Sequence, residues 1–333
     1  MKISINSKIP SSTIENGVYQ NLEKTPMMTD DASYVKIFRK QFKAPKSVSP
    51  QDKIPSVTTD LKNFYSEKPA VIWFGHSSYL IHCRGINILV DPVFCGYASP
   101  FPFMMKAFEG ANTYGVEEMP TIDFHLQTHN HYDHLDKKSI KALRSKTNQY
   151  LVPKGVKKDM LNAKIAEEKI TELDWGSHLE ISEEIKITAT PARHFSGRGL
   201  KRNTSLWSSY ILEIFGYKIF IGGDSGYGKH FKEIGNAFEK FDLAILECGQ
   251  YGEYWPLIHT QPEEIIEVAN DLNAEVILPV HWAKFKLAYH PWQEPIERLL
   301  KVGINKKIAT PQIGEPLILE EKLPQTQWWK DIS

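Results

Sequence analysis

Four side chains that can bind a metal lie within six residues, in the segment His129-Asn130-His131-Tyr132-Asp133-His134. Two histidines at i and i+2 of an extended segment point to the same side. Asp133 and His134 follow where the chain turns, since Asp136 is expected to cap a helix over 137–145. One strand end could therefore present one ligand pair to a metal and a second pair to a neighbouring metal. Three histidines and a carboxylate suit zinc or iron better than magnesium or calcium, which prefer oxygen ligands.

Three further ligand candidates lie where predicted strands end. His194 follows a strand predicted at 184–189, Asp224 follows one at 217–221, and His281 follows one at 275–280. The glycines before Asp224 let the backbone approach a bound group, and its two oxygens could bridge two metals. Alone, a histidine at a strand end is usually structural, and an aspartate before Ser-Gly usually belongs to a turn. Together with residues 129–134 they complete two ligand sets of similar size, which favours a dinuclear centre.

The elements that must position these residues are predicted from hydrophobic periodicity. Strands are expected at 71–74, 79–81, 86–90, 123–128, 184–189, 209–214, 217–221, 241–246 and 275–280. Helices are expected at 137–145, 154–168, 229–240, 262–272 and 294–302. An antiparallel strand run followed by alternating strands and helices predicts an α/β fold in which helices lie outside packed sheets.

Two regions of different composition divide the chain of 333 residues. Residues 1–66 are rich in Lys, Ser, Thr, Pro and Asp and show no sustained apolar periodicity. We expect them to form an N-terminal arm that packs on or flanks the domain, and not a domain of their own. Residues 67–333 are expected to form one domain, although a chain of 333 residues could bury either one large core or two modest ones.

The composition restricts the classes of partner and compartment. The 40 basic and 40 acidic residues give zero formal net charge, and therefore no electrostatic reason to expect nucleic acid as a partner. Three scattered cysteines without a CxxC pair predict neither a disulfide framework nor a thiolate zinc site. No apolar run reaches the length of a membrane span and no secretory signal is apparent, so a cytoplasmic location is expected. The oligomeric state does not follow from the sequence, with which a homodimer would be compatible.

The order of the ligand candidates resembles that of the metallo-β-lactamase superfamily: His129-x-His131-x-Asp133-His134, then His194, Asp224 and His281. Other segments resemble its branch of N-acylphosphatidylethanolamine-hydrolysing phospholipase D. These are Phe74-Gly75-His76-Ser77-Ser78, Asp91-Pro92-Val93-Phe94, Glu172-Leu173-Asp174-Trp175-Gly176, Pro191-Ala192-Arg193-His194 and Gly223-Asp224-Ser225-Gly226. The resemblance covers roughly residues 70–310 and leaves the arm unmatched.

The resemblance implies an αβ/βα four-layer sandwich with two metals at one edge of the two sheets. It implies one Zn²⁺ on His129, His131 and His194, and a second on Asp133, His134 and His281, with Asp224 bridging. Iron or manganese would also fit these ligands. A hydroxide between the two cations would be available near neutral pH and would attack phosphorus in line. Asp133 and Asp224 thus belong to the predicted catalytic set, and no side chain needs to act as the nucleophile.

Residues for the substrate are predicted beside this centre. The resemblance implies a substrate-facing histidine at His259, which could contact phosphate or protonate the leaving alkoxide. A histidine before a helix is also often only a local hydrogen-bonding residue, so both roles stay open. Arg198 and Arg202 are candidates for recognition of an anion, the alternative being a solvated basic loop. His76 is expected below the metals in a supporting role.

An apolar run, Phe101-Pro102-Phe103-Met104-Met105-Lys106-Ala107-Phe108, suits a lipid-facing surface or a lid over an acyl chain. In the first case the protein would lie peripherally at the inner face of the membrane. The alternative is that this run packs on the N-terminal arm.

These observations predict a metal-dependent hydrolase with two zinc ions. We expect a phosphodiesterase of the N-acylphosphatidylethanolamine phospholipase D type, acting on a lipid or small-molecule phosphodiester. One alternative is a lactonase related to the ascorbate-6-phosphate lactonases, which share the ligand scheme. Another is an iron-binding oxidoreductase on the same fold, which the lack of a Gly-rich phosphate-binding fingerprint disfavours.

Overall fold

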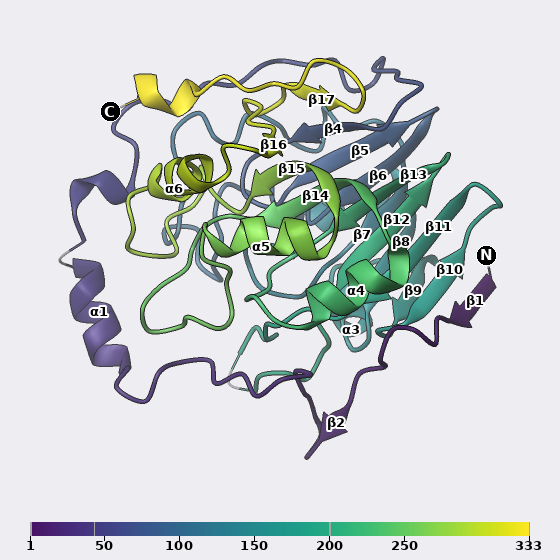
Figure 1. Ribbon diagram of the computed structural model, residues 1–333, viewed down its shortest axis with the longest axis horizontal. Coiled ribbons are helices and arrows are strands. Elements are labelled where there is room, and N and C mark those ends of the chain that lie inside the picture. The colour runs from purple at the N-terminus through teal and green to yellow at the C-terminus, as the bar shows by residue number, and fades with distance from the viewer. Residues whose placement is uncertain (1, 43, 200, 333) are drawn as a thin grey trace.

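The computed structural model describes residues 2–42, 44–199 and 201–332. The outer limits of the predicted arm and domain, residues 1 and 333, lie outside these ranges. Two mixed sheets packed on each other form the centre of the molecule (Figure 1), and one large hydrophobic cluster contains buried side chains from both.

The first sheet has eight strands. In spatial order they are β1 (Lys2–Ile5), β10 (Ser177–Glu180), β11 (Ile185–Thr190), β12 (Ser209–Ile214), β13 (Tyr217–Ile221), β14 (Phe241–Glu247), β15 (Ala274–Val280) and β16 (Lys307–Ile308). The second sheet has seven. Their order is β17 (Pro316–Ile318), β4 (Ala70–Trp73), β5 (Tyr79–Cys83), β6 (Ile86–Val90), β7 (Ile122–Leu126), β8 (Thr147–Pro153) and β9 (Ile170–Leu173).

Both sheets change from antiparallel to parallel pairing part-way across. Strands β10 to β13 pair antiparallel, and β13 to β16 pair parallel. Strands β4 to β6 pair antiparallel, and β6 to β9 pair parallel. Parallel strands need crossovers, which helices supply, and their carboxyl ends meet at one edge where loops are free to carry function.

The helices lie outside the two sheets (Figure 1). They are α1 (Tyr34–Phe42), α2 (Lys137–Leu143), α3 (Lys157–Asn162), α4 (His230–Phe238), α5 (Glu264–Asp271) and α6 (Glu294–Val302), with 3₁₀ turns at Lys46–Val48, Glu167–Lys169 and Trp328–Asp331. All but α1, which belongs to the N-terminal arm, form the two outer layers. Helix α5 packs on β14 and β15 and contacts α4 and α6, which lie in front of the sheet in Figure 1. Residues of α2 and α3 share a separate buried cluster with β8 and β9. The αβ/βα four-layer sandwich is therefore confirmed.

The structure departs from the sequence prediction chiefly in elements that lack a clear apolar pattern. The helix expected over 154–168 is reduced to α3, because Lys164 adopts a positive φ of 67° and ends it, and a 3₁₀ turn follows. Strand β8 was not predicted, since polar side chains interrupt its sequence Thr147-Asn-Gln-Tyr-Leu-Val-Pro153. Strands β9 and β10 were not predicted either.

The first 66 residues contain regular structure of their own. Strand β1 pairs antiparallel with β10 at the sheet edge, and β2 (Ile14–Glu15) and β3 (Val18–Tyr19) form a small hairpin. The purple chain in Figure 1 then runs along the lower side of the molecule to α1. Helix α1 was not among the helices predicted from the sequence, because the arm shows no sustained apolar periodicity.

Within the described residues, no helix is long and apolar enough to cross a membrane.

Candidate metal centre

The seven side chains predicted as ligands lie together at the edge where the parallel strands end. They are His129, His131, Asp133, His134, His194, Asp224 and His281, all buried or half-buried. Strands β7, β13 and β15 lead directly into the loops that carry His129, Asp224 and His281. The ligand candidates thus come from loops of both sheets.

Backbone hydrogen bonds join the loops at this edge, and two of the residues involved have a strained backbone conformation. The backbone N–H of His281 donates to the carbonyl of His76 at 2.9 Å, and that of His76 donates to the carbonyl of Trp282 at 3.1 Å. Both histidines have positive φ, 67° at His281 and 53° at His76. Such conformations cost of the order of 1–3 kcal/mol each in a residue other than glycine, and packing must hold them. Trp282 supplies such packing, because its buried ring stacks on Trp73 at 5.7 Å between centroids.

A first group of three nitrogens converges from His129, His131 and His194. Nδ1 of His131 lies 2.9 Å from Nε2 of His129 and 3.2 Å from Nε2 of His194. Two nitrogens bound to one tetrahedral zinc are about 3.4 Å apart, given bonds of about 2.1 Å. The three imidazoles are thus spaced as ligands of a single ion.

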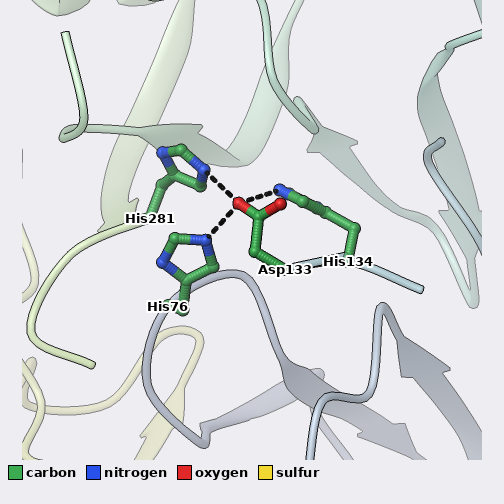
Figure 2. A group of neighbouring side chains, drawn as sticks. All are labelled: His76, Asp133, His134 and His281. Atoms are coloured by element: carbon green, nitrogen blue, oxygen red, sulfur yellow. Dashed lines mark hydrogen bonds and ion pairs between the residues drawn. The ribbon is translucent and has the colours of Figure 1, made fainter. Parts of the chain in front are cut away.

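A second group surrounds Asp133, as Figure 2 shows. Its Oδ2 lies 3.4 Å from Nε2 of His281, 3.5 Å from Nε2 of His134 and 2.9 Å from Nε2 of His76. Asp133, His134 and His281 match the predicted second ligand set. His76 is fully buried, and its Nε2 contacts the same carboxylate, so the supporting role expected for it stays a prediction.

Asp224 lies between the two groups. Its Oδ1 is 3.2 Å from Nε2 of His134, and its Oδ2 is 3.2 Å from Nε2 of His281. The same Oδ2 is 3.7 Å from Nε2 of His194. A carboxylate in this position faces both nitrogen groups at once, as a bridging ligand must.

Hydrogen bonds on the far side of the rings fix their orientation. Nδ1 of His134 lies 2.7 Å from Oδ2 of Asp91, whose Oδ1 accepts from the backbone N–H of Thr128. Nδ1 of His194 lies 2.8 Å from the carbonyl of Ile258. Partners of this kind are usual for metal-binding histidines, because they set the tautomer and leave the other nitrogen free.

Several buried atoms in the cluster test whether a metal would fit. Nε2 of His134, Nε2 of His281 and Oδ1 of Asp224 make ion-pair contacts but no well-formed hydrogen bond. Buried polar atoms normally have partners, and a bound ion is one recognised explanation for an exception. The donor set of imidazoles and carboxylates suits zinc or iron. The residues therefore fit a pair of such ions.

Burial and charge act differently on the two histidine groups. Burial lowers the pKa of His131 to about 4 and lowers the pKa of His129 and His194 as well. These rings are neutral at pH 7, which is the form that binds metal. At His281 burial also acts to lower the pKa, but Asp224 and Asp133 outweigh it and raise the pKa to about 10. The carboxylates thus concentrate negative charge around the second group.

His259 lies on the cavity wall together with a residue that sequence reasoning missed. Its Nδ1 is 2.6 Å from Oε2 of Glu247, and its ring stacks on His281 with centroids 5.2 Å apart. Glu247 is buried, and its Oε1 accepts from the backbone N–H of Ser225 at 2.7 Å. The available signal was a glutamate directly at the end of a buried apolar strand, β14.

The two arginines predicted to bind substrate have different surroundings. Nη1 of Arg198 donates to the carbonyls of Asn130 at 3.0 Å and Leu135 at 2.7 Å, and its guanidinium lies over the Tyr132 ring. Arg198 therefore holds the loop between β7 and α2, and it is absent from the residues that line the cavity. Arg202 does line the cavity, beside Phe195. Substrate binding by either arginine stays a prediction.

A cavity of about 350 Å³ opens onto the cluster. Its polar end includes the ligand candidates His131, Asp133, His194, Asp224 and His281, together with His259. The remaining wall is largely apolar and is formed by Met27, Met28, Ile37, Met105, Phe195, Trp255, Ile258, Leu287 and Tyr289, with Arg202 and Gln250.

Comparison with known proteins identifies the family. Residues 86–282 match the model of the beta-lactamase superfamily domain. The chain belongs to the metallo-β-lactamase superfamily. It is 33% identical over 327 residues to an uncharacterized protein of Mycobacterium tuberculosis, covering 96% of this chain and 88% of that one. It is 31% identical over 265 residues to N-acyl-phosphatidylethanolamine-hydrolyzing phospholipase D 1 of Caenorhabditis elegans, covering 74% and 72%. The resemblance to this branch is thereby confirmed.

The fold of the chain is also found in a solved structure. Igni18, a metallo hydrolase from Ignicoccus hospitalis, superposes with a TM-score of 0.58 at 19% identity, covering 77% of this chain and all of that one. The candidate metal centre and the family together make the protein a metal-dependent hydrolase of the metallo-β-lactamase fold.

Proposed function

We propose that the protein hydrolyses lipid phosphodiesters of the N-acylphosphatidylethanolamine type with a pair of zinc ions. The observation that carries this proposal is a single cavity with two kinds of wall. The candidate metal ligands line one end, while methionine, leucine, tryptophan and tyrosine side chains line the rest. A substrate with a charged, scissile end and an apolar body complements such a cavity.

The ligands for this chemistry would be the two sets already described. His129, His131 and His194 would hold one ion, Asp133, His134 and His281 the other, and Asp224 would contact both. Zinc ions held there would lower the pKa of water and neutralise charge on phosphate oxygens. Zinc is the proposed metal, and iron or manganese would suit the same donors.

The chain's own side chains would then orient the substrate and move a proton. The contact between Nδ1 of His259 and Glu247 leaves Nε2 of His259 available to a bound substrate. That nitrogen could donate a proton to the departing alkoxide, as a general acid does. The guanidinium of Arg202 on the same cavity wall would attract an anionic group. The apolar wall would exclude water from the rest of the cavity.

An exposed apolar loop beside the cavity supports a lipid surface as the source of substrate. Phe101 and Phe103 are 52% and 72% exposed, and their rings stack on each other. Met104 and Met105 are also exposed, and Met105 is shared with the cavity wall. Contiguous exposed apolar side chains of this kind mark interaction sites. We therefore propose peripheral membrane contact through this loop.

The test is incubation of zinc-loaded protein with N-acylphosphatidylethanolamine, followed by mass spectrometry of the products. The proposal predicts phosphatidic acid and an N-acylethanolamine, both absent with the Asp224→Asn variant. Hydrolysis of lactones with all phosphodiesters intact would replace the proposal by the lactonase alternative. Iron acquired during expression, with redox turnover instead of hydrolysis, would favour the oxidoreductase alternative.

A further inference from the structure

The N-terminal arm is attached directly to the loop that carries one ligand candidate. The side-chain amide of Asn21 donates from Nδ2 to the carbonyl of His194 at 2.8 Å. Its Oδ1 accepts from the backbone N–H of His194 at 3.0 Å. One side chain of the arm thus pairs with both backbone groups of a residue 173 positions away, which fixes the arm against the candidate centre.

Neighbouring contacts hold the same stretch of the arm in place. Nε of Arg193 donates to Oγ1 of Thr25 at 3.0 Å, and its Nη1 donates to the carbonyl of Tyr227 at 2.8 Å. Oε2 of Glu23 accepts from the backbone N–H of Lys229 at 3.1 Å. Residues 21–25 are therefore tied both to the loop of His194 and to the loop that follows Asp224.

Beyond this anchor the arm forms one side of the cavity. Met27, Met28 and Ile37 line it, and we call these three side chains the arm wall. The carbonyl of Ile37 accepts from the hydroxyl of Tyr289, another lining residue, at 3.2 Å. The arm wall is thus held at both ends, by residues 21–25 and by this contact of α1.

The chemistry of the arm wall indicates what it binds. All three side chains are apolar and uncharged, and they lie in the same cavity as Met105 and Leu287 from the domain. Methionine is flexible and polarisable, so it adapts to a linear alkyl chain better than to one rigid shape. A volume of about 350 Å³ is near the lower end for ligand sites, which are typically about 300–1,000 Å³. The cavity therefore suits one chain, with the rest of the molecule outside.

We propose that the arm wall binds the apolar chain of the substrate next to the scissile group and sets its chain-length preference. This inference rests on the proposed function for the identity of the scissile group. It gives residues 21–42 a part in substrate selection, while the domain supplies the metal ligands.

The first experiment measures binding, so that it does not depend on turnover. Zinc-loaded wild-type protein is titrated calorimetrically with butylphosphonate and with dodecylphosphonate below its micellar concentration. We expect dodecylphosphonate to bind about tenfold or more tightly, because each methylene buried from water adds favourable transfer free energy. Met27→Ser/Met28→Ser/Ile37→Ser should lose most of this ratio and keep its affinity for butylphosphonate within about twofold.

The matched control changes apolar side chains of the same arm that lie outside the cavity. Leu22 and Val35 are 42% and 60% exposed and are not lining residues, so Leu22→Ser/Val35→Ser should keep the wild-type ratio. A second pair of variants tests the proposal in case the triple variant does not fold. Ile37→Trp should fill the cavity and weaken dodecylphosphonate binding about fivefold or more, whereas Val35→Trp should not.

If the ratio of dodecylphosphonate to butylphosphonate affinity is unchanged in the folded triple variant and in Ile37→Trp, the proposal for the arm wall is wrong. It is also wrong if the control variants lose as much of this ratio as the arm-wall variants do. Hydrolysis of phosphodiesters by the wild type is scored separately. If the wild type hydrolyses none but the ratio depends on the arm wall, the inference stands and the proposed function falls. If the wild type hydrolyses phosphodiesters but the arm-wall variants leave the affinity ratio unchanged, only the inference about the arm wall is contradicted.

Discussion

At the scale of single residues, the candidate centre is a set of ligand atoms whose directions are fixed from outside. Asp91 is fully buried and contacts His134, and Glu247 contacts His259. Neither acid was predicted as a metal ligand, and each contacts Nδ1 of a histidine. Each acid acts through the imidazole that it orients. Substituting these acids therefore tests the orientation of a histidine ring without removing a predicted metal ligand.

Asp91→Asn should weaken metal binding without removing a ligand. The amide keeps the size of the side chain but loses the negative charge next to Nδ1 of His134, so we expect metal affinity to fall about 10- to 100-fold. Competition with a chelating dye measures this change. Asp123→Asn, at the opposite end of β7, is the control and should bind as the wild type does. Equal affinity in both variants would contradict an orienting role for Asp91.

His259→Ala should keep its metals and lose turnover. A general acid or base contributes about 100- to 10,000-fold to rate, so a fall in kcat of at least about 100-fold is expected. Glu247→Gln should cause a smaller fall, because it removes the charge behind the ring and leaves the ring itself. Metal analysis accompanies the kinetics. Loss of metal from His259→Ala would show that the histidine is structural.

The clustering of the seven ligand candidates followed from local sequence, but Asp91 and Glu247 did not. The ligands stand in one dense motif or at strand ends, which have a readable pattern. Asp91 meets His134 across 43 residues and Glu247 meets His259 across 12. Such pairs depend on how loops of different strands approach, which hydrophobic periodicity does not encode. For the same reason the sequence did not predict that Arg198 donates to the backbone carbonyls of Asn130 and Leu135.

At the scale of elements, the loop between β7 and α2 carries four of the seven ligand candidates. Asp136 caps α2 by accepting from the backbone N–H of Lys138, as its position in the sequence predicts. The guanidinium of Arg198 donates hydrogen bonds to backbone carbonyls of this loop. The loop is therefore fixed both by a local cap and by contacts from a distant segment.

Arg198→Gln and Arg202→Gln should behave differently. Loss of the Arg198 guanidinium leaves half-buried carbonyls without donors, so we expect the free energy of unfolding to fall by about 2–4 kcal/mol. Arg202→Gln should lower the free energy of unfolding less, because Arg202 does not donate to these carbonyls, and it should raise KM for an anionic substrate. Urea unfolding and steady-state kinetics measure these effects. Equal destabilisation by both would contradict the structural role of Arg198.

At the scale of the whole molecule, two stacked sheets bring loops of distant segments to one edge, and the arm completes the cavity there. The layers were predictable because most buried strands are continuous apolar runs. The course of the arm was not, since its contacts are single polar side chains such as Asn21. The apolar loop at residues 101–105 reaches the same cavity through Met105, so the proposed membrane contact would lie beside the cavity.

Phe103→Asp should reduce binding to phospholipid vesicles by about tenfold, because it replaces an exposed aromatic ring, which we propose to contact the lipid, by a charge. Co-sedimentation with vesicles of phosphatidylcholine and phosphatidylethanolamine measures the bound fraction. Ile304→Asp is the control, since Ile304 is 82% exposed and does not line the cavity. No difference between the two variants would remove the membrane contact from the proposal.

The most direct test of the dinuclear centre is a count of metal ions per chain. Protein loaded with zinc and freed of excess metal is measured by inductively coupled plasma and native mass spectrometry. We expect two zinc ions in the wild type and no more than one in Asp224→Asn, because that carboxylate faces both ligand groups. Saturation of the wild type with one ion, or with none, would contradict this expectation.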